Sequence, residues 1–227
     1  MSAMARVSQA HLDARRRQIL DAAALCFARN GFHATSMQDV LKEADLSAGA
    51  VYRYFSGKEE LIAAIVGEVL ASVRAAFEDA AGQYPPAPPD LLVGAVLGRT
   101  LATKASLTID GEPAFPRLVV QVWSETVRNP KLAAVLREGY DAVGAAWERI
   151  VACYQDAGMM RADLPPEHVA RTMIAAVIGF TAQQSLFGPL PVEALQNGLR
   201  ALMSMSVPES GTGTDHGSVN VPETRSN

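Results

Sequence analysis

The chain has 227 residues, of which 49% are hydrophobic and 19% charged, as is typical of a globular protein. No apolar run approaches the roughly 18 residues that a membrane span requires, and the N-terminus lacks the apolar core of a signal peptide, so we expect a cytoplasmic protein with no membrane partner. The formal net charge is −4, but residues 1–58 hold eight basic and five acidic residues, a net +3 that leaves −7 for the remainder. Such asymmetry points to a nucleic-acid partner for the basic part.

The first four predicted helices are separated by short turns. Residues 15–29 have apolar side chains at helical spacing, and Asn30-Gly31 ends this helix. Ser36 is the expected N-cap of the second helix, with Asp39 completing an acidic variant of the capping box, and Ser47 is the expected N-cap of a short helix over residues 48–54. The sequence "SGKE", residues 56–59, fits a capping box that opens a fourth helix, which extends to about residue 81.

The rest of the chain also predicts helices. A proline-rich break, "GQYPPAPPD", is followed by expected helices over residues 91–103, 115–128, 131–154, 169–187 and 192–205, with "TIDGEP" as a turn. From about residue 207 the chain is polar and rich in Gly and Ser, so we expect a disordered tail. The prediction is an all-α protein of nine helices with no strand.

The two cysteines and four histidines give no sign of a metal site. Cys26 and Cys153 are far apart among alanines and aromatic residues, which favours buried free thiols over a disulfide or redox pair. The histidines lack the spacing of metal ligands, so we expect no metal and no cofactor.

Two helices joined by a tight turn, over residues 36–55, form a helix-turn-helix. At about 100° per residue, Val51 and Phe55 face inward, whereas Tyr52, Arg53 and Tyr54 border an exposed ridge suited to a major groove. The alternative is that both tyrosines pack on neighbouring helices and that Arg53 is a solvated surface residue.

The segment "NGFHATSMQDVLKEADLSAGAVYRYFSGKEELIAAIV" resembles the DNA-binding domain of the tetracycline-repressor (TetR) family. The matching elements are Asn30-Gly31-Phe32, Thr35-Ser36, Ser47, Gly49, Val51-Tyr52, Tyr54-Phe55 and Lys58-Glu59-Leu61. The resemblance covers about residues 12–65. It implies a nine-helix TetR-like fold in which residues 12–65 bind DNA, residues 66–206 form a ligand-binding and dimerisation domain, and residues 207–227 are the tail.

The resemblance also implies which residues contact double-stranded operator DNA. Phosphate contacts are expected from Thr35 or Ser36, Tyr52, Tyr54 and Lys58, and base or groove contacts from Gln38, Ser47, Ala48, Gly49, Ala50 and Arg53. Tyr54 stands where the family usually has His, and Ala48 and Ala50 stand where longer polar side chains often read bases. Direct readout therefore rests on Gln38 and Arg53, with Ala50 able to contact a thymine methyl group.

A small-molecule pocket is expected beyond the proline-rich break, because an apolar wall with a few polar groups is what such a pocket needs. The candidate lining residues are Phe115, Trp123, Tyr140, Trp147, Phe180, Gln183 and Gln184, of which Trp123 and the two glutamines are the strongest. For each single residue the competing interpretation is an ordinary place in the core. The resemblance further implies a homodimer formed through the last two helices.

The sequence therefore predicts a transcriptional repressor that a small hydrophobic inducer releases from its operator. The alternatives are an activator of the same family, or a helical ligand-binding or scaffold protein without DNA binding. We expect no enzymatic activity, since the chain lacks GxSxG, HExxH, GxGxxG and GxxxxGK[ST] motifs and any clustered Ser/His/Asp set.

Overall fold

The computed structural model describes residues 2–204, and this range contains nine α-helices and one small antiparallel sheet. The all-α prediction is confirmed for this part of the chain. The expected tail over residues 207–227 and the expected helix end at Met205 lie outside the described residues. The elements are α1 (Ser2–Asn30), α2 (Met37–Ala44), α3 (Ala48–Tyr52), α4 (Lys58–Ala81), α5 (Pro89–Thr103), β1 (Thr108–Ile109), β2 (Glu112–Pro113), α6 (Phe115–Thr126), α7 (Pro130–Asp156), α8 (Pro166–Phe187) and α9 (Val192–Met203).

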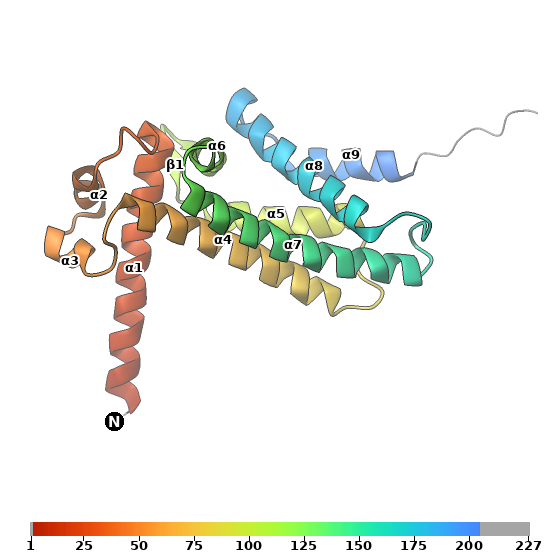
Figure 1. The fold of residues 1–227 in the computed structure, drawn as a ribbon, viewed down its shortest axis with the longest axis horizontal. Helices are drawn as coiled ribbons and strands as arrows, with labels where there is room; N and C mark the ends of the chain where they lie inside the picture. Colours follow the sequence, from red (N-terminus) through yellow and green to blue (C-terminus); the bar gives the residue numbers. More distant parts are fainter. Residues whose placement is uncertain (1, 205–227) are drawn as a thin grey trace, which may run out of the picture.

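The helices form two parts joined by α4, and we call α1–α3 the head and α5–α9 the body (Figure 1). In the body, α4 lies along α7 and also contacts α5, α8 packs on α7 and α6, and α9 packs on α5. The N-terminal half of α1 projects away from the remaining helices (Figure 1). No helix within residues 2–204 has both the length and the apolar character needed to cross a bilayer.

One hydrophobic core joins the head to the near end of the body. It contains Phe27 of α1 and Val51 of α3 together with Leu61 of α4, and it continues to Leu118 of α6 and Leu132 of α7. The predicted domain boundary near residue 65 therefore falls inside a shared core, with α4 common to both sides. A displacement of α4 or α6 necessarily reaches the head, because close-packed interiors transmit strain.

A second core fills the far end of the body. The ring centroids of Phe77 on α4 and Trp147 on α7 lie 4.9 Å apart, with the ring planes inclined at 48°. Tyr154 is fully buried, and its hydroxyl donates to the Ala87 carbonyl in the proline-rich segment. This hydrogen bond fixes the segment against α7.

The two cysteines are free thiols, as predicted. Burial, together with the nearby Glu43 carboxylate, raises the pKa of the Cys26 thiol to about 11. Cys153 is partly buried. No group of three or more His, Cys, Asp and Glu residues within the described range is arranged to hold a metal ion.

The caps predicted for α2 and α3 are confirmed, but the one predicted for α4 is wrong. The Ser36 N–H donates to the Asp39 carboxylate over 2.9 Å, and the Asp39 N–H donates to Ser36 Oγ over 3.2 Å. At α4 the N-cap is Gly57, and Ser56 donates from both its N–H and its hydroxyl to the carboxylate of Glu60. Glu60, one residue beyond the predicted partner, reaches Ser56 and competes successfully for it.

Other boundaries differ from prediction for local reasons. Helix α1 begins at Ser2, well before residue 15, because the intervening residues include no Gly or Pro to end it. Helix α3 ends at Tyr52, two residues early. The predicted turn "TIDGEP" is a β-hairpin, with Asp110 and Gly111 at φ of 53° and 83°. Two consecutive left-handed residues match the twist of paired strands, which the expectation of no strand overlooked.

Helices α4 and α7 approach closely where Gly139 meets Leu70. A Cβ atom added at Gly139 would lie 2.3 Å from Leu70 Cδ1 and 3.0 Å from Leu70 Cβ. Gly144, on the same helix, has room, since an added Cβ would lie 3.9 Å from Ile174 Cδ1.

We predict that Gly139→Ala lowers the free energy of unfolding by about 1–3 kcal/mol, because overpacking separates the two helices. Gly144→Ala, the matched control, is expected to raise it by about 0.4–1 kcal/mol, since alanine restricts the unfolded chain. Urea denaturation followed by circular dichroism measures both values. Equal effects of the two variants would contradict the close contact.

Candidate nucleic-acid interface and ligand cavity

The short helix α3 presents the ridge that the sequence predicts. Ser47 caps it by accepting the Ala50 N–H over 3.3 Å, while Val51 and Phe55 are buried in the head core. Ala48 and Gly49 are exposed, and nothing lies within 4 Å of a Cβ added at Gly49. The surface of α3 is therefore low and open to the close approach of another molecule.

The two tyrosines behave differently. Tyr52 is 50% exposed, whereas Tyr54 is partly buried and packs on the head core. Arg53, between them, is exposed. The alternative in which both rings pack on neighbouring helices thus holds for Tyr54 in part and does not hold for Tyr52.

Thr35 and Ser36 are engaged locally. Thr35 is buried, and its hydroxyl lies 2.8 Å from the Gly31 carbonyl and 3.1 Å from the Cys26 carbonyl. In this conformation its side chain secures the turn after α1 and is not presented to a phosphate. Ser36 is exposed, with its hydroxyl donating to Asp39 over 2.7 Å, and Gln38 is exposed in the first turn of α2.

Lys58 points inward, contrary to the prediction that it reaches a phosphate. Its ammonium donates to the carbonyls of Phe32 at 2.9 Å and Thr35 at 3.1 Å, with that of His33 at 3.4 Å, and it lies 4.7 Å from the centroid of the Phe32 ring. The carbonyls at and beyond the end of a helix lack intrahelical partners, and a cation satisfies them. Lys58 therefore ties the start of α4 to the turn that leads into α2.

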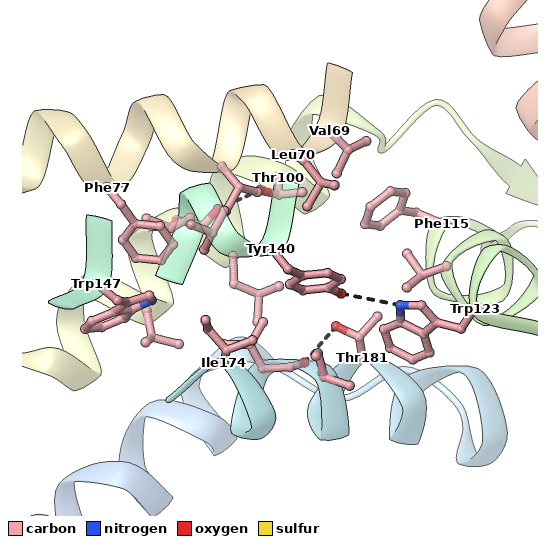
Figure 2. Close-up of a pocket in the computed structure, with 18 residues that line it drawn as sticks. Val69, Leu70, Phe77, Thr100, Phe115, Trp123, Tyr140, Trp147, Ile174 and Thr181 are labelled. Atoms are coloured by element: carbon pink, nitrogen blue, oxygen red, sulfur yellow. Dashed lines mark hydrogen bonds between the residues drawn. The ribbon is translucent and has the colours of Figure 1, made fainter. Parts of the chain in front are cut away.

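A cavity of about 140 Å³ lies in the body, between α4, α5, α6, α7 and α8 (Figure 2). Four of the seven predicted lining residues are found there: Phe115, Trp123, Tyr140 and Trp147. The sequence interpretation missed the side chains from α4 and α5, although the stripe on α4 was visible as helical spacing. These are Val69, Leu70, Val73, Phe77, Val93, Val96, Leu97 and Thr100.

Three predicted residues on α8 do not line this cavity. Phe180 is buried elsewhere in the core and Gln183 is exposed. Gln184 lies one turn beyond Thr181, past the end of the cavity, in a separate hollow that Arg117 also lines. Its Nε2 atom is buried and has no hydrogen-bond partner among the described residues. The helix presents Ile174, Val177, Ile178 and Thr181 to the cavity instead.

The polar groups of the cavity are few and are bonded to the protein. The Trp123 indole N–H donates to the Tyr140 hydroxyl oxygen over 3.3 Å, and the Thr100 and Thr181 hydroxyls each donate to a carbonyl of their own helix over 2.9 Å. Burial raises the pKa of Tyr140, although the bond from Trp123 opposes the shift. The phenol is therefore neutral over the physiological range.

Helix α6, which forms one wall of the cavity, also contacts the head. Glu125 is buried near the end of α6, and its carboxylate lies 3.0 Å from Nε2 of His33 in the turn after α1. One turn earlier, Gln121 packs against Gly31, whose φ of +79° ends α1 as predicted. A second link joins Arg16 of α1 to Glu68 of α4.

The two helices expected to form the dimer interface are partly committed to their own protomer. Met173 and Phe180 of α8 are buried. Helix α9 is held to α5 by Arg200, which pairs with the buried Asp90 carboxylate at 2.7 Å and 2.9 Å. Their outer faces expose large apolar side chains at Leu186, Phe187, Leu202 and Met203.

Comparisons with known proteins agree with the fold. Residues 19–65 match the family model described as "Bacterial regulatory proteins, tetR family", and residues 101–206 match "BetI-type transcriptional repressor, C-terminal". The transcriptional regulator UidR of Escherichia coli K12 is 27% identical over 190 residues, or 83% of this chain and 90% of that protein.

Two solved structures illustrate the structural likeness. GusR of Salmonella enterica superposes with a TM-score of 0.65 at 29% identity, covering 85% of this chain and 96% of that one. A SmeT–triclosan complex superposes with a TM-score of 0.66 at 22% identity, covering 92% and 100%.

We predict that Lys58→Met lowers the free energy of unfolding by about 1–3 kcal/mol in the absence of DNA, because the partly buried carbonyls of Phe32 and Thr35 lose their donor. Lys42→Met, at an exposed position on α2, is the control and should change it by less than about 0.5 kcal/mol. Urea denaturation monitors both variants. A Lys58→Met protein as stable as the wild type would argue that this side chain serves DNA rather than the fold.

Proposed function

The chain belongs to the TetR family of DNA-binding transcriptional regulators, and we propose that it is a repressor released from its operator by a small hydrophobic inducer. In this proposal a homodimer holds operator DNA through two copies of α3. The inducer enters the cavity of the body and favours a conformation in which the two heads no longer fit the duplex.

One observation carries this proposal: the helices that wall the cavity are also the helices that contact the head. Helix α4 lines the cavity with Val69, Leu70 and Val73, and its first residue bonds the turn before α2. Helix α6 lines the cavity with Trp123 and contacts the same turn through Glu125. A ligand that moves either helix therefore moves the head.

The DNA contacts follow from what α3 exposes. The small residues Ala48 and Gly49 allow the helix backbone to approach the major groove, and Tyr52 extends a hydroxyl towards a phosphate. Arg53 and Gln38 supply the polar base contacts. Ser36, Ser47, Ala50 and Tyr54 contribute at the edges, whereas Thr35 and Lys58 support the head from within.

Dimerisation is part of the mechanism, since one head with so few phosphate contacts binds weakly. The exposed apolar side chains of α8 and α9 are the best surface for it. On α8 the stripe of Ala175, Ala176 and Gly179 allows a second helix to come close. Twofold symmetry then presents the two α3 helices to the half-sites of a near-palindrome.

The switch is an equilibrium between two arrangements of the heads. A ligand shifts it only by as much as it binds one arrangement better than the other. Repression is the favoured sign, because residues 101–206 match a repressor C-terminal domain. Activation uses the same geometry, and a promoter–reporter strain with and without the protein distinguishes the two.

We predict that Tyr52→Phe weakens binding to a duplex from the protein's own promoter region by about tenfold for each half-site, since each half-site loses a hydrogen bond to a charged phosphate. Arg53→Ala should reduce the discrimination between this duplex and a scrambled duplex by about 1–3 kcal/mol for each half-site, since a base contact is lost there. Fluorescence anisotropy with the two duplexes measures both effects. Tyr84→Phe, on an exposed ring in the proline-rich segment, is the control and should bind like the wild type.

We also predict that neutral hydrophobic compounds raise the melting temperature and release the operator, and that Val177→Phe, which fills the cavity, abolishes both effects while leaving operator affinity intact. Triclosan is a suitable first compound, given the SmeT complex. Thermal shift and anisotropy provide the two readouts. A compound that raises the melting temperature of the wild type without changing operator affinity would contradict the release mechanism.

A further inference from the structure

Tyr140 carries an unused hydrogen-bond donor inside the cavity. A phenol has one O–H donor and also accepts, whereas an indole N–H only donates. Because Trp123 donates to the Tyr140 oxygen, the hydroxyl hydrogen of Tyr140 is left for another acceptor. Among the side chains and carbonyls that the structure describes, none receives it. Figure 2 shows the ring across the middle of the cavity, with its hydroxyl directed towards the Trp123 end.

The remaining lining offers no other free hydrogen-bond donor. Thr100 and Thr181 use their hydroxyls on carbonyls of Val96 and Val177. None of the 18 lining residues is Asp, Glu, Lys, Arg or His. An ion placed here would lose its hydration without gaining a counter-charge, at a large cost in free energy. Carboxylates and ammonium groups are therefore poor occupants of this site.

The volume limits the size of the occupant. A cavity of about 140 Å³ is comparable to engineered apolar cavities that take benzene. A second apolar space of about 70 Å³ adjoins it and shares Phe115, Trp123 and Tyr140 as walls. Tyr140 therefore lines both spaces. A ligand that occupies them would carry its hydrogen-bond acceptor between apolar parts, opposite the Tyr140 hydroxyl.

We infer that the occupant of this cavity is an uncharged, mainly apolar compound of one or two rings whose single hydrogen-bond acceptor, a carbonyl or an ether oxygen, receives the Tyr140 hydroxyl hydrogen. Tyr140 is then the residue that selects this class over hydrocarbons of the same shape. The inference rests on the proposed function in one respect, the entry of a ligand into this cavity.

The test compares three probes of nearly equal size on the full chain by isothermal titration calorimetry, without DNA. Acetophenone carries the acceptor, α-methylstyrene replaces the carbonyl oxygen by a methylene group, and benzoate replaces the methyl ketone by a carboxylate. The wild type should bind acetophenone about three- to tenfold more tightly than α-methylstyrene, the gain typical of one net hydrogen bond. Benzoate should bind more weakly than either.

In Tyr140→Phe the preference for acetophenone should fall to about one, while the affinity for α-methylstyrene stays within about twofold, since only an oxygen atom is removed. Tyr84→Phe is the matched control and should keep the wild-type preference. Circular dichroism and the melting temperature verify that each variant is folded. An undiminished preference in folded Tyr140→Phe, benzoate bound as tightly as acetophenone, or no binding of either neutral probe up to its solubility limit would each overturn the inference.

Operator release is measured separately by anisotropy on the same samples. If acetophenone binds with the expected dependence on Tyr140 but leaves the operator bound, the ligand class stands and the release mechanism fails. If release occurs equally in the wild type and in folded Tyr140→Phe with acetophenone and with α-methylstyrene, the proposed function stands and the inference about Tyr140 fails.

Discussion

The hydrophobic core shared by the head and the body is the constraint on which the rest of this structure depends. Leu61 of α4 belongs to the same buried cluster as Phe27 of α1 and Leu118 of α6, so the core of the head is shared with α4 and α6. Polar contacts from Lys58 and Glu125 to the turn after α1 further fix α4 and α6 relative to the head. Regulation by a ligand in the body then requires no dedicated relay, because α4 and α6, which wall its site, also pack in the core shared with the head.

The unfilled cavity lowers the stability of the folded protein, and a ligand that fills it offsets this loss. Unfilled apolar volume destabilises a core by roughly 24 cal/mol per Å³, so about 140 Å³ corresponds to roughly 3 kcal/mol. A compound that fills the cavity recovers part of this free energy. If it binds better to one position of α4 or α6 than to another, the difference in binding free energy can change how the head fits DNA. The lining residues of the cavity carry no charge, whereas residues 1–58 carry a net positive charge, so the cavity and the N-terminal part of the chain differ sharply in their chemistry.

Much of this architecture is visible in the sequence. Helical spacing predicts all the helices of residues 2–204, and the Ser36–Asp39 cap and the burial of Val51 and Phe55 follow from short-range rules. Some failures are local, such as the cap at Ser56, which bonds Glu60, and the hairpin at Asp110 and Gly111. The failures at the candidate sites have another cause: they concern side chains whose partners are distant in the sequence. Lys58 turns inward because it meets carbonyls 23 to 26 positions away, and the cavity is formed by helices whose packing no local pattern specifies. Gln184 lies in a separate hollow beside Arg117 of α6, and this placement is likewise set by tertiary packing.

The close contact between Gly139 and Leu70 has a mechanical consequence. It touches α4 near its middle, about 18 Å from Lys58 and about 10 Å from Phe77 at 1.5 Å per residue. A rigid helix restrained at this point rotates about it. A displacement near Phe77 then moves the Lys58 end in the opposite direction, by nearly twice the distance. A shift of half an ångström near Phe77 would thus become a shift of almost one ångström at Lys58, which bonds the turn leading into α2.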